Sequence, residues 1–264
     1  MAVIIHTKRT DPGGVGYIWP SRNSSAYNRG MSKLVLFDLD GTLLSTQGAG
    51  MRAMARAGAG LFGDGFHFEG IVAAGGLDPL LFAAAAGRCG VDINDDNHTQ
   101  FADAYFTTLE EELTIAACNG GVRVMPGVVE LLASLHAHEG VTLGLLTGNY
   151  GRTAELKLRA GGIEPAQFVV RSFGDEAPDR PGMVPVALGR YESLHGRAVD
   201  PRDVVLIGDT PKDVEAAQAH GCIALAVATG PFDVEQLLAA GADAAVADLA
   251  DPTVLWEMLS LAAA

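Results

Sequence analysis

The sequence predicts an α/β protein: a doubly wound parallel sheet with a small helical segment inserted after its first strand. Short, nearly continuous apolar runs recur along the chain, and runs of this length suit strands buried on both faces. Helix-like stretches separate the runs, and such alternation forms a parallel sheet covered by helices on both sides. An alanine-rich block between residues 46 and 120 interrupts the alternation, which indicates an insertion.

The apolar runs are the candidate strands of the sheet. They lie at residues 33–37, 141–146, 168–170, 204–207, 223–227 and 244–247, and the helix-like stretches between them cover about 128–138, 153–160, 184–195, 211–220 and 234–240. Ligands of such sheets bind beyond the carboxyl ends of the strands. Polar residues at those ends are therefore the candidates for function.

The inserted block is predicted to contain helices at 49–57, 79–89 and 97–112, and residues 46–120 are interpreted as a helical cap domain. The sheet domain is then formed by residues 31–45 and 121–264. Residues 1–30 have turn-rich segments, such as Asp11-Pro12-Gly13-Gly14, and lack a periodic apolar pattern. They are predicted to be a flexible N-terminal extension.

Charge and composition exclude several classes of function. The 264 residues carry a formal net charge of −14, which disfavours nucleic acid and anionic membrane surfaces as partners. The chain lacks an apolar run of about 18 residues, so a transmembrane helix is not expected. The N-terminus lacks the apolar core of a signal peptide, and the three cysteines are far apart, so a cytoplasmic location is expected. The sequence leaves the oligomeric state open.

The first polar strand end is Asp38-Leu39-Asp40-Gly41-Thr42. Two carboxylates at one strand end repel each other unless a cation lies between them, and Mg²⁺ prefers oxygen ligands of this kind. The alternative reading is a strand that is followed by an ordinary Asp-Gly turn.

Two further strand ends carry polar residues. Thr147-Gly148-Asn149 could present a hydroxyl and backbone N–H groups to a phosphate, or could be a plain turn or helix cap. Asp209 follows the strand at 204–207 and could be a metal ligand, an N-cap, or both. Asp213 lies one turn into the next helix, where it could orient Lys212 or a metal-bound water.

Taken together, these three motifs resemble those of the haloacid dehalogenase superfamily over residues 31–264, and the sequence is most similar there to phosphoglycolate-phosphatase-like hydrolases. The resemblance implies a Rossmann-like core, a helical cap, a small phosphorylated metabolite as substrate and Mg²⁺ as cofactor. Asp38 is then the nucleophile that becomes an aspartyl-phosphate, and Asp40 the general acid and base. Thr147, Gly148 and Asn149 bind the phosphoryl group. The metal ligands are Asp38, the Asp40 carbonyl and Asp209.

The resemblance also implies a cation that neutralises the phosphoryl group. The family's usual Lys-Pro pattern is absent, and Asp179-Arg180-Pro181 stands in its place, so Arg180 is the candidate. Lys157 is the alternative, but it is expected to lie too far along its helix unless that helix is bent. In the insert, Gly76-Leu77 departs from the polar segment of relatives, which leaves the substrate open.

Three other functions remain to be weighed. A phosphomutase of the same fold would use the same two carboxylates. A non-catalytic phosphometabolite sensor would leave the acid/base Asp40 without a role. A receiver-type signalling module would leave the helical insert without one. Asp40 also argues against a dehalogenase, because the dehalogenating relatives lack an acid at this position.

Overall fold

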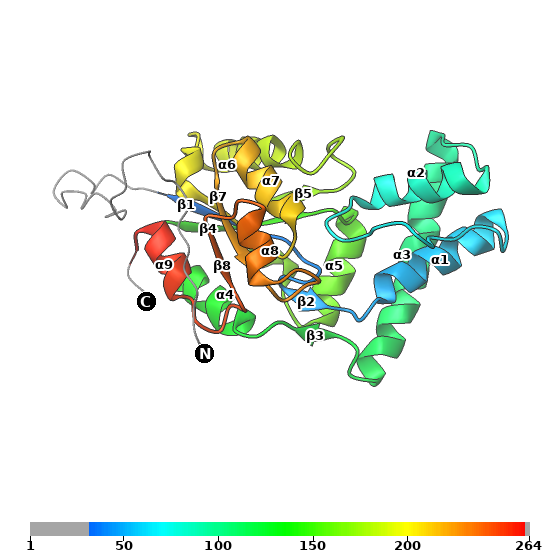
Figure 1. Cartoon of the computed structure of the whole chain (residues 1–264), viewed down its shortest axis with the longest axis horizontal. Coiled ribbons are helices and arrows are strands. Elements are labelled where there is room, and N and C mark those ends of the chain that lie inside the picture. Colours follow the sequence, from blue (N-terminus) through cyan, green and yellow to red (C-terminus); the bar gives the residue numbers. More distant parts are fainter. Residues whose placement is uncertain (1–31, 262–264) are drawn as a thin grey trace.

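The computed structural model describes residues 32–261 and contains a six-stranded parallel sheet in the order β5-β4-β1-β6-β7-β8 (Figure 1). The predicted doubly wound parallel sheet is therefore confirmed. The extension predicted at residues 1–30 lies outside the described residues. The strands are β1 (Lys33–Phe37), β4 (Val141–Thr147), β5 (Val170–Phe173), β6 (Val204–Gly208), β7 (Ile223–Val227) and β8 (Ala244–Val246).

Apolar side chains on both faces of β1 explain why this strand lies inside the sheet and not at its edge. Its residues are buried, with Val35 and Phe37 in one apolar cluster and Leu34 and Leu36 in another. Because successive side chains of a strand point to opposite faces, such a strand needs cover on both sides.

Helices cover both faces of the sheet (Figure 1). The face of Val35 and Phe37 is covered by α4 (Val128–Ala137), α5 (Gly151–Ala160) and α9 (Thr253–Leu259). The face of Leu34 and Leu36 is covered by α6 (Met183–His195), α7 (Pro211–Ala219) and α8 (Val234–Ala239). Single 3-10 turns, η1 (Pro165–Gln167) and η2 (Pro201–Asp203), precede β5 and β6. Because all six strands run parallel, their carboxyl ends lie at one edge of the sheet.

The strand predicted at 168–170 is shifted, because β5 begins only at Val170 and continues to Phe173. Phe168 instead closes the turn η1, and its fully buried ring packs edge-on against Phe37. The apolar residues 168–170 therefore belong partly to the end of a turn and partly to the start of a strand. The strand was not recognisable as an apolar run, because its two middle residues, Arg171 and Ser172, are polar.

The inserted segment is helical and has its own apolar cluster. It contains α1 (Ala49–Phe62), α2 (Asp78–Cys89) and α3 (Asp95–Cys118), and the short antiparallel strands β2 (Leu44–Ser45) and β3 (Arg123–Val124) pair where it joins the sheet domain. Stacked aromatic rings, including Phe82 and Phe101 with centroids 4.7 Å apart, fill its interior. Figure 1 shows the three helices grouped at one end of the sheet domain.

The insert touches the sheet domain at the carboxyl ends of the strands. The backbone N–H of Asp78 donates to the carbonyl oxygen of Gly148 at 2.7 Å. A Cβ atom at Gly148 would lie 2.0 Å from the carbonyl oxygen of Gly76, so this close approach requires glycine. Among residues 32–261, no helix is both long and apolar enough to cross a membrane.

Candidate active site

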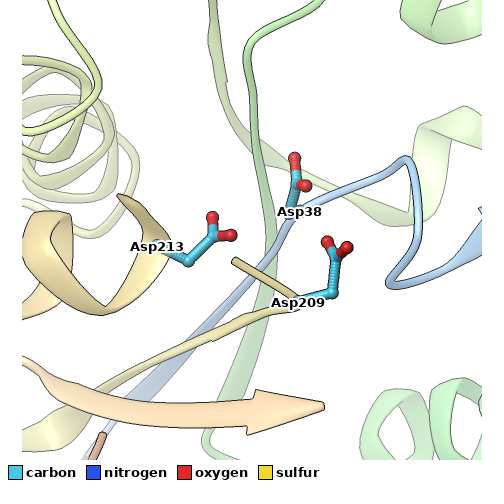
Figure 2. A group of neighbouring side chains, drawn as sticks. All are labelled: Asp38, Asp209 and Asp213. Atoms are coloured by element: carbon cyan, nitrogen blue, oxygen red, sulfur yellow. The ribbon is translucent and has the colours of Figure 1, made fainter. Parts of the chain in front are cut away.

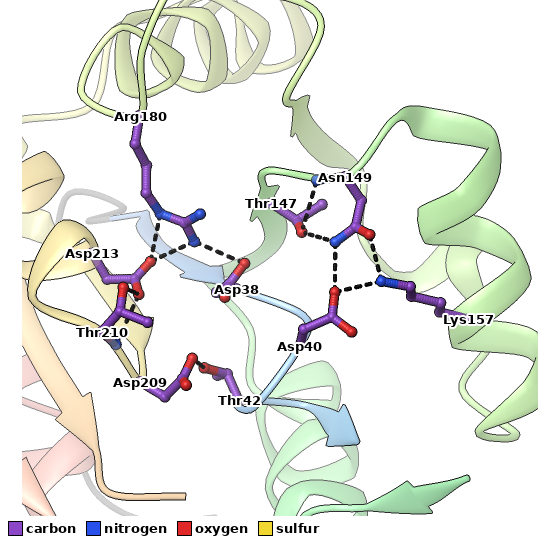
Figure 3. Close-up of polar contacts among 10 residues, drawn as sticks. All are labelled: Asp38, Asp40, Thr42, Thr147, Asn149, Lys157, Arg180, Asp209, Thr210 and Asp213. Atoms are coloured by element: carbon purple, nitrogen blue, oxygen red, sulfur yellow. Dashed lines mark hydrogen bonds and ion pairs between the residues drawn. The ribbon is translucent and has the colours of Figure 1, made fainter. Parts of the chain in front are cut away.

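The three polar motifs of the sequence meet at one edge of the sheet. β1 pairs with β4 on one side and with β6 on the other, so Asp38, Thr147 and Asp209 come from neighbouring strand ends (Figure 3). The chain also reverses its direction of winding at β1, and ligands of open α/β sheets bind at such a point. The structure thus brings together the residues that the sequence selected.

A cluster of three buried carboxylates could hold a metal ion. Oxygen atoms of Asp38, Asp209 and Asp213 lie within 4.8 Å of one another (Figure 2). Burial and the neighbouring acids raise the pKa of Asp38 to about 6 and that of Asp209 to about 8, although Arg180 lowers both. Crowded, buried oxygen donors with excess negative charge fit a small hard cation such as Mg²⁺.

Arg180 is the cation beside this cluster. Its Nη2 atom lies 2.8 Å from Asp38 Oδ1, and its Nε donates to Asp213 Oδ1 at 2.8 Å (Figure 3). The guanidinium group is buried, in the loop that precedes α6. Arg180 therefore reaches the site, as expected from the sequence, and forms an ion pair with the carboxylate of Asp38.

Asp213 contacts Thr210 and Arg180 instead of the expected Lys212. Its Oδ2 atom accepts from the backbone N–H of Thr210 at 3.0 Å and from the Thr210 hydroxyl at 2.6 Å, which caps the start of α7. Its Oδ1 atom accepts from Arg180, not from Lys212. One carboxylate thus fixes both the helix start and the guanidinium group.

Lys157 also reaches the site, so the expectation that it lies too far along its helix is wrong. Its Nζ atom is 2.6 Å from Asp40 Oδ2 and 2.6 Å from Asn149 Oδ1 (Figure 3). Helix α5 begins only two residues after Asn149, and Lys157 lies on its buried side. The lysine side chain is long enough to run back from there to the strand ends.

Asp40 is held by a small polar network. Besides Lys157, the amide of Asn149 donates to Asp40 Oδ2 and to Thr147 Oγ1, both at 2.8 Å. The side chain of Asp40 is 43% exposed, in contrast to that of Asp38 at 7%. The two aspartates therefore occupy different surroundings, one open to the cavity and one buried beside a cation.

The turn after β1 is shaped for close packing against Asp209. Gly41 has φ +82°, and a Cβ atom there would lie 2.3 Å from Asp209 Oδ2. The hydroxyl of Thr42 donates to Asp209 Oδ1 at 3.2 Å. Gly41 and Thr42 thus set the position of Asp209, a role that the sequence motif had not revealed.

A cavity of about 450 Å³ lies over these groups, between the sheet domain and the helical insert. Asp78 at the start of α2 lines it, and nothing in the sequence had assigned this residue a role of its own. Its Oδ2 atom accepts from the backbone N–H of Tyr150 at 3.1 Å, and burial raises the pKa of its carboxyl group to about 7, although Lys157 lowers it. Only its burial at the start of α2, invisible in the sequence, distinguishes this acid.

The Asp78→Asn protein should lose less stability with rising pH than the wild type. A carboxyl group whose pKa is raised from 3.8 to about 7 binds its proton more tightly in the folded state. Its contribution to folding is therefore lost as the pH rises from about 4 to about 7, with a limiting slope of about 1.4 kcal/mol per pH unit. Urea unfolding of both proteins across this range measures the difference. Parallel pH profiles would contradict it.

The strand ends thus bring together a buried carboxylate beside a guanidinium group, a second carboxylate open to the cavity, and a group of acids that could hold a metal ion. The chain belongs to the haloacid dehalogenase-like hydrolase family, whose model matches residues 32–221. The resemblance to this superfamily is thereby confirmed.

Known relatives agree with this family. The chain is 32% identical over 126 residues to a phosphoglycolate phosphatase of Synechococcus elongatus, a match that covers 48% of this chain and 56% of that protein. It is 28% identical over 222 residues to a phosphoglycolate phosphatase of Yersinia pestis, covering 82% and 90%. The crystal structure of CbbY from Rhodobacter sphaeroides in complex with phosphate has the same fold, with a TM-score of 0.64, 21% identity and coverage of 84% and 96%.

Proposed function

We propose that this protein is a Mg²⁺-dependent phosphatase that hydrolyses a small phosphomonoester through an aspartyl-phosphate on Asp38. The observation that carries the proposal is the buried carboxylate of Asp38, 2.8 Å from Arg180, on the wall of the cavity. The phosphatases among the relatives support hydrolysis, and they favour it over the phosphomutase and sensor alternatives.

The first half of the reaction transfers the phosphoryl group to the protein. A carboxylate oxygen of Asp38 forms a bond to phosphorus while the bond from phosphorus to the ester oxygen breaks. Asp40 donates its proton to the departing alcohol. Thr147, Gly148 and Asn149 line the cavity at the end of β4 and bind the phosphoryl oxygens, while Arg180 orients the nucleophile.

The second half releases phosphate. Asp40, now ionised, takes a proton from a water molecule, and the resulting hydroxide attacks the phosphorus atom of the aspartyl-phosphate. Inorganic phosphate leaves, and the carboxylate of Asp38 is restored. Lys157 holds Asp40 between the two steps through its contact of 2.6 Å.

Asp38, Asp209 and the carbonyl group of Asp40 would hold Mg²⁺, which would reduce the repulsion between the nucleophile and the phosphoryl group. The insert at 46–120 acts as a cap that closes over the cavity and limits access to small substrates. We place the reaction in the cytoplasm, without nucleic acid or membrane partners.

Phosphate release from a panel of small phosphomonoesters tests the reaction class. The panel includes 2-phosphoglycolate and is assayed with Mg²⁺ and with excess EDTA. We expect release with Mg²⁺ that EDTA abolishes. Equal release under both conditions would contradict the metal requirement. Transfer of phosphate within a sugar phosphate without net release would indicate a mutase.

The Asp209→Asn protein should need a Mg²⁺ concentration at least about tenfold higher for half-maximal activity, because it loses one charged ligand. It should stay folded without metal, since the change removes one of three crowded carboxylates. A titration of activity with Mg²⁺ measures the shift. The control is Asp64→Asn, an exposed acid of the insert. An unchanged Mg²⁺ requirement would exclude Asp209 as a ligand.

A further inference from the structure

The two halves of the cavity are lined by different kinds of side chain. The half formed by the sheet domain contains the proposed catalytic groups. The half formed by the insert contains mostly apolar side chains, two polar ones, one phenol and one acid; they are Met51, Met54, Leu81, Thr46, Gln47, Tyr105 and Asp78. The leaving alcohol of a bound phosphomonoester must point toward this second half, because the phosphoryl group occupies the first.

Within residues 32–261, Lys157 and Arg180 are the cations that line the cavity, and both already face carboxylates. Lys157 binds Asp40, and Arg180 binds Asp38 and Asp213. Arg52 on α1 does not line the cavity, and its guanidinium group is engaged by Glu112 on α3 at 2.9 Å and by the carbonyl of Gln47 at 2.8 Å. Neither half of the cavity thus offers a spare cation.

Asp78 is fixed where the leaving alcohol would lie. Its own N–H binds the carbonyl of Gly148, and its carboxylate accepts from the N–H of Tyr150, on either side of Asn149. The carboxylate therefore lies beside the proposed phosphoryl-binding turn, is buried, and has little freedom to move away.

A second negative charge on the substrate would be poorly tolerated here. Asp38, Asp40, Asp78 and Asp209 line the cavity against two cations, and a bound Mg²⁺ ion would only balance them before the phosphoryl group adds its own charge. An anion next to the buried carboxylate of Asp78 costs binding energy, whereas a hydroxyl or ammonium group could donate to it.

We infer that the insert side of the cavity selects phosphomonoesters whose leaving alcohol carries hydrogen-bond donors and no second anion, and that Asp78 is the specificity-determining residue. The inference rests on the proposed phosphatase function and names its substrate class. It separates this protein from an enzyme that prefers the carboxylate-bearing phosphoglycolate.

Three esters of nearly equal size test this selection. They are 2-hydroxyethyl phosphate, phosphoethanolamine and 2-phosphoglycolate, which differ mainly in a hydroxyl, an ammonium or a carboxylate group. With Mg²⁺ at about pH 8, above the pKa of Asp78, we expect kcat/KM for the better of the first two to exceed that for phosphoglycolate by about tenfold or more. p-Nitrophenyl phosphate serves as the reference for phosphatase chemistry.

Two variants assign the preference to the insert side. Asp78→Asn keeps an oxygen that can accept from the N–H of Tyr150. This variant should reduce, by about tenfold, the ratio of kcat/KM for the better of the first two esters to kcat/KM for phosphoglycolate. Met51→Lys, at a half-buried position of the cavity wall, should raise kcat/KM for phosphoglycolate specifically. Replacing a residue with a merely structural role would change kcat/KM for all three esters by the same factor.

The outcomes separate the inference from the proposed function. Hydrolysis of p-nitrophenyl phosphate with equal or better turnover of phosphoglycolate than of the other two esters contradicts the inference and leaves the phosphatase standing. The inference is likewise contradicted, and the phosphatase left standing, if Asp78→Asn changes kcat/KM for all three esters by the same factor. Failure on every ester, p-nitrophenyl phosphate included, contradicts the phosphatase itself and the inference with it.

Discussion

Replacing Asp38 by asparagine should reduce turnover of the best phosphomonoester by about 10⁴-fold or more, as expected when a nucleophile is removed. An amide of the same shape cannot attack phosphorus, whereas the surrounding contacts can persist. Because Asp38 is one of three crowded buried carboxylates, neutralising it should not unfold the protein. Turnover at saturating Mg²⁺ and the circular dichroism spectrum of the variant are the measurements.

The matched control for Asp38→Asn is again Asp64→Asn, which removes an exposed acid of the insert and should keep full turnover. A folded Asp38→Asn protein that retains more than about a tenth of wild-type turnover would show that another group attacks phosphorus. Deamidation back to aspartate can be excluded by mass measurement of the purified variant.

Replacing Arg180 by glutamine should lower the free energy of unfolding by about 3–5 kcal/mol, because it leaves buried carboxylates without their counter-charge. The guanidinium group is 3% exposed and contacts both Asp38 and Asp213. Turnover should also fall strongly, since the nucleophile loses its orienting partner. Urea unfolding without metal at about pH 8, above the pKa of about 6 of Asp38, measures the stability.

The destabilisation should be smaller at about pH 5 than at pH 8, because protonation of Asp38 and Asp209 then relieves the missing charge. Arg123→Gln provides the control, since Arg123 is exposed on β3. A loss of less than about 1 kcal/mol at pH 8 would mean that the ion pairs of Arg180 contribute no more than a surface pair.

The sheet and the principal site could be predicted from sequence because both depend on local patterns. Doubly buried strands such as β1 and β6 are short apolar runs, and a parallel sheet brings their ends to one edge whatever the connections contain. Asp38 and Asp209 were therefore found without coordinates. In contrast, β5 is half polar and β2 has two residues, so neither has a periodic signal of its own.

The residues that sequence reasoning placed wrongly or missed depend on contacts between distant segments. Lys157 reaches Asp40 only because α5 starts at once after the β4 turn and turns this side chain inward. The relevance of Asp78 depends on how the insert docks on Gly148, through atoms 70 residues apart in the chain. Asp213 binds Arg180 rather than its neighbour Lys212, because the start of α7 points its side chain into the site.

The measurement that tests the central claim most directly is a search for the phosphorylated aspartate. In the Asp40→Asn protein the second step lacks its base, whereas p-nitrophenyl phosphate needs little help from an acid in the first. After mixing with this ester and Mg²⁺ and an acid quench, peptide mass spectrometry should find one phosphoryl group on Asp38, with about one nitrophenol released per protein. Release of nitrophenol with the phosphoryl group on another residue, or on none, would contradict the account.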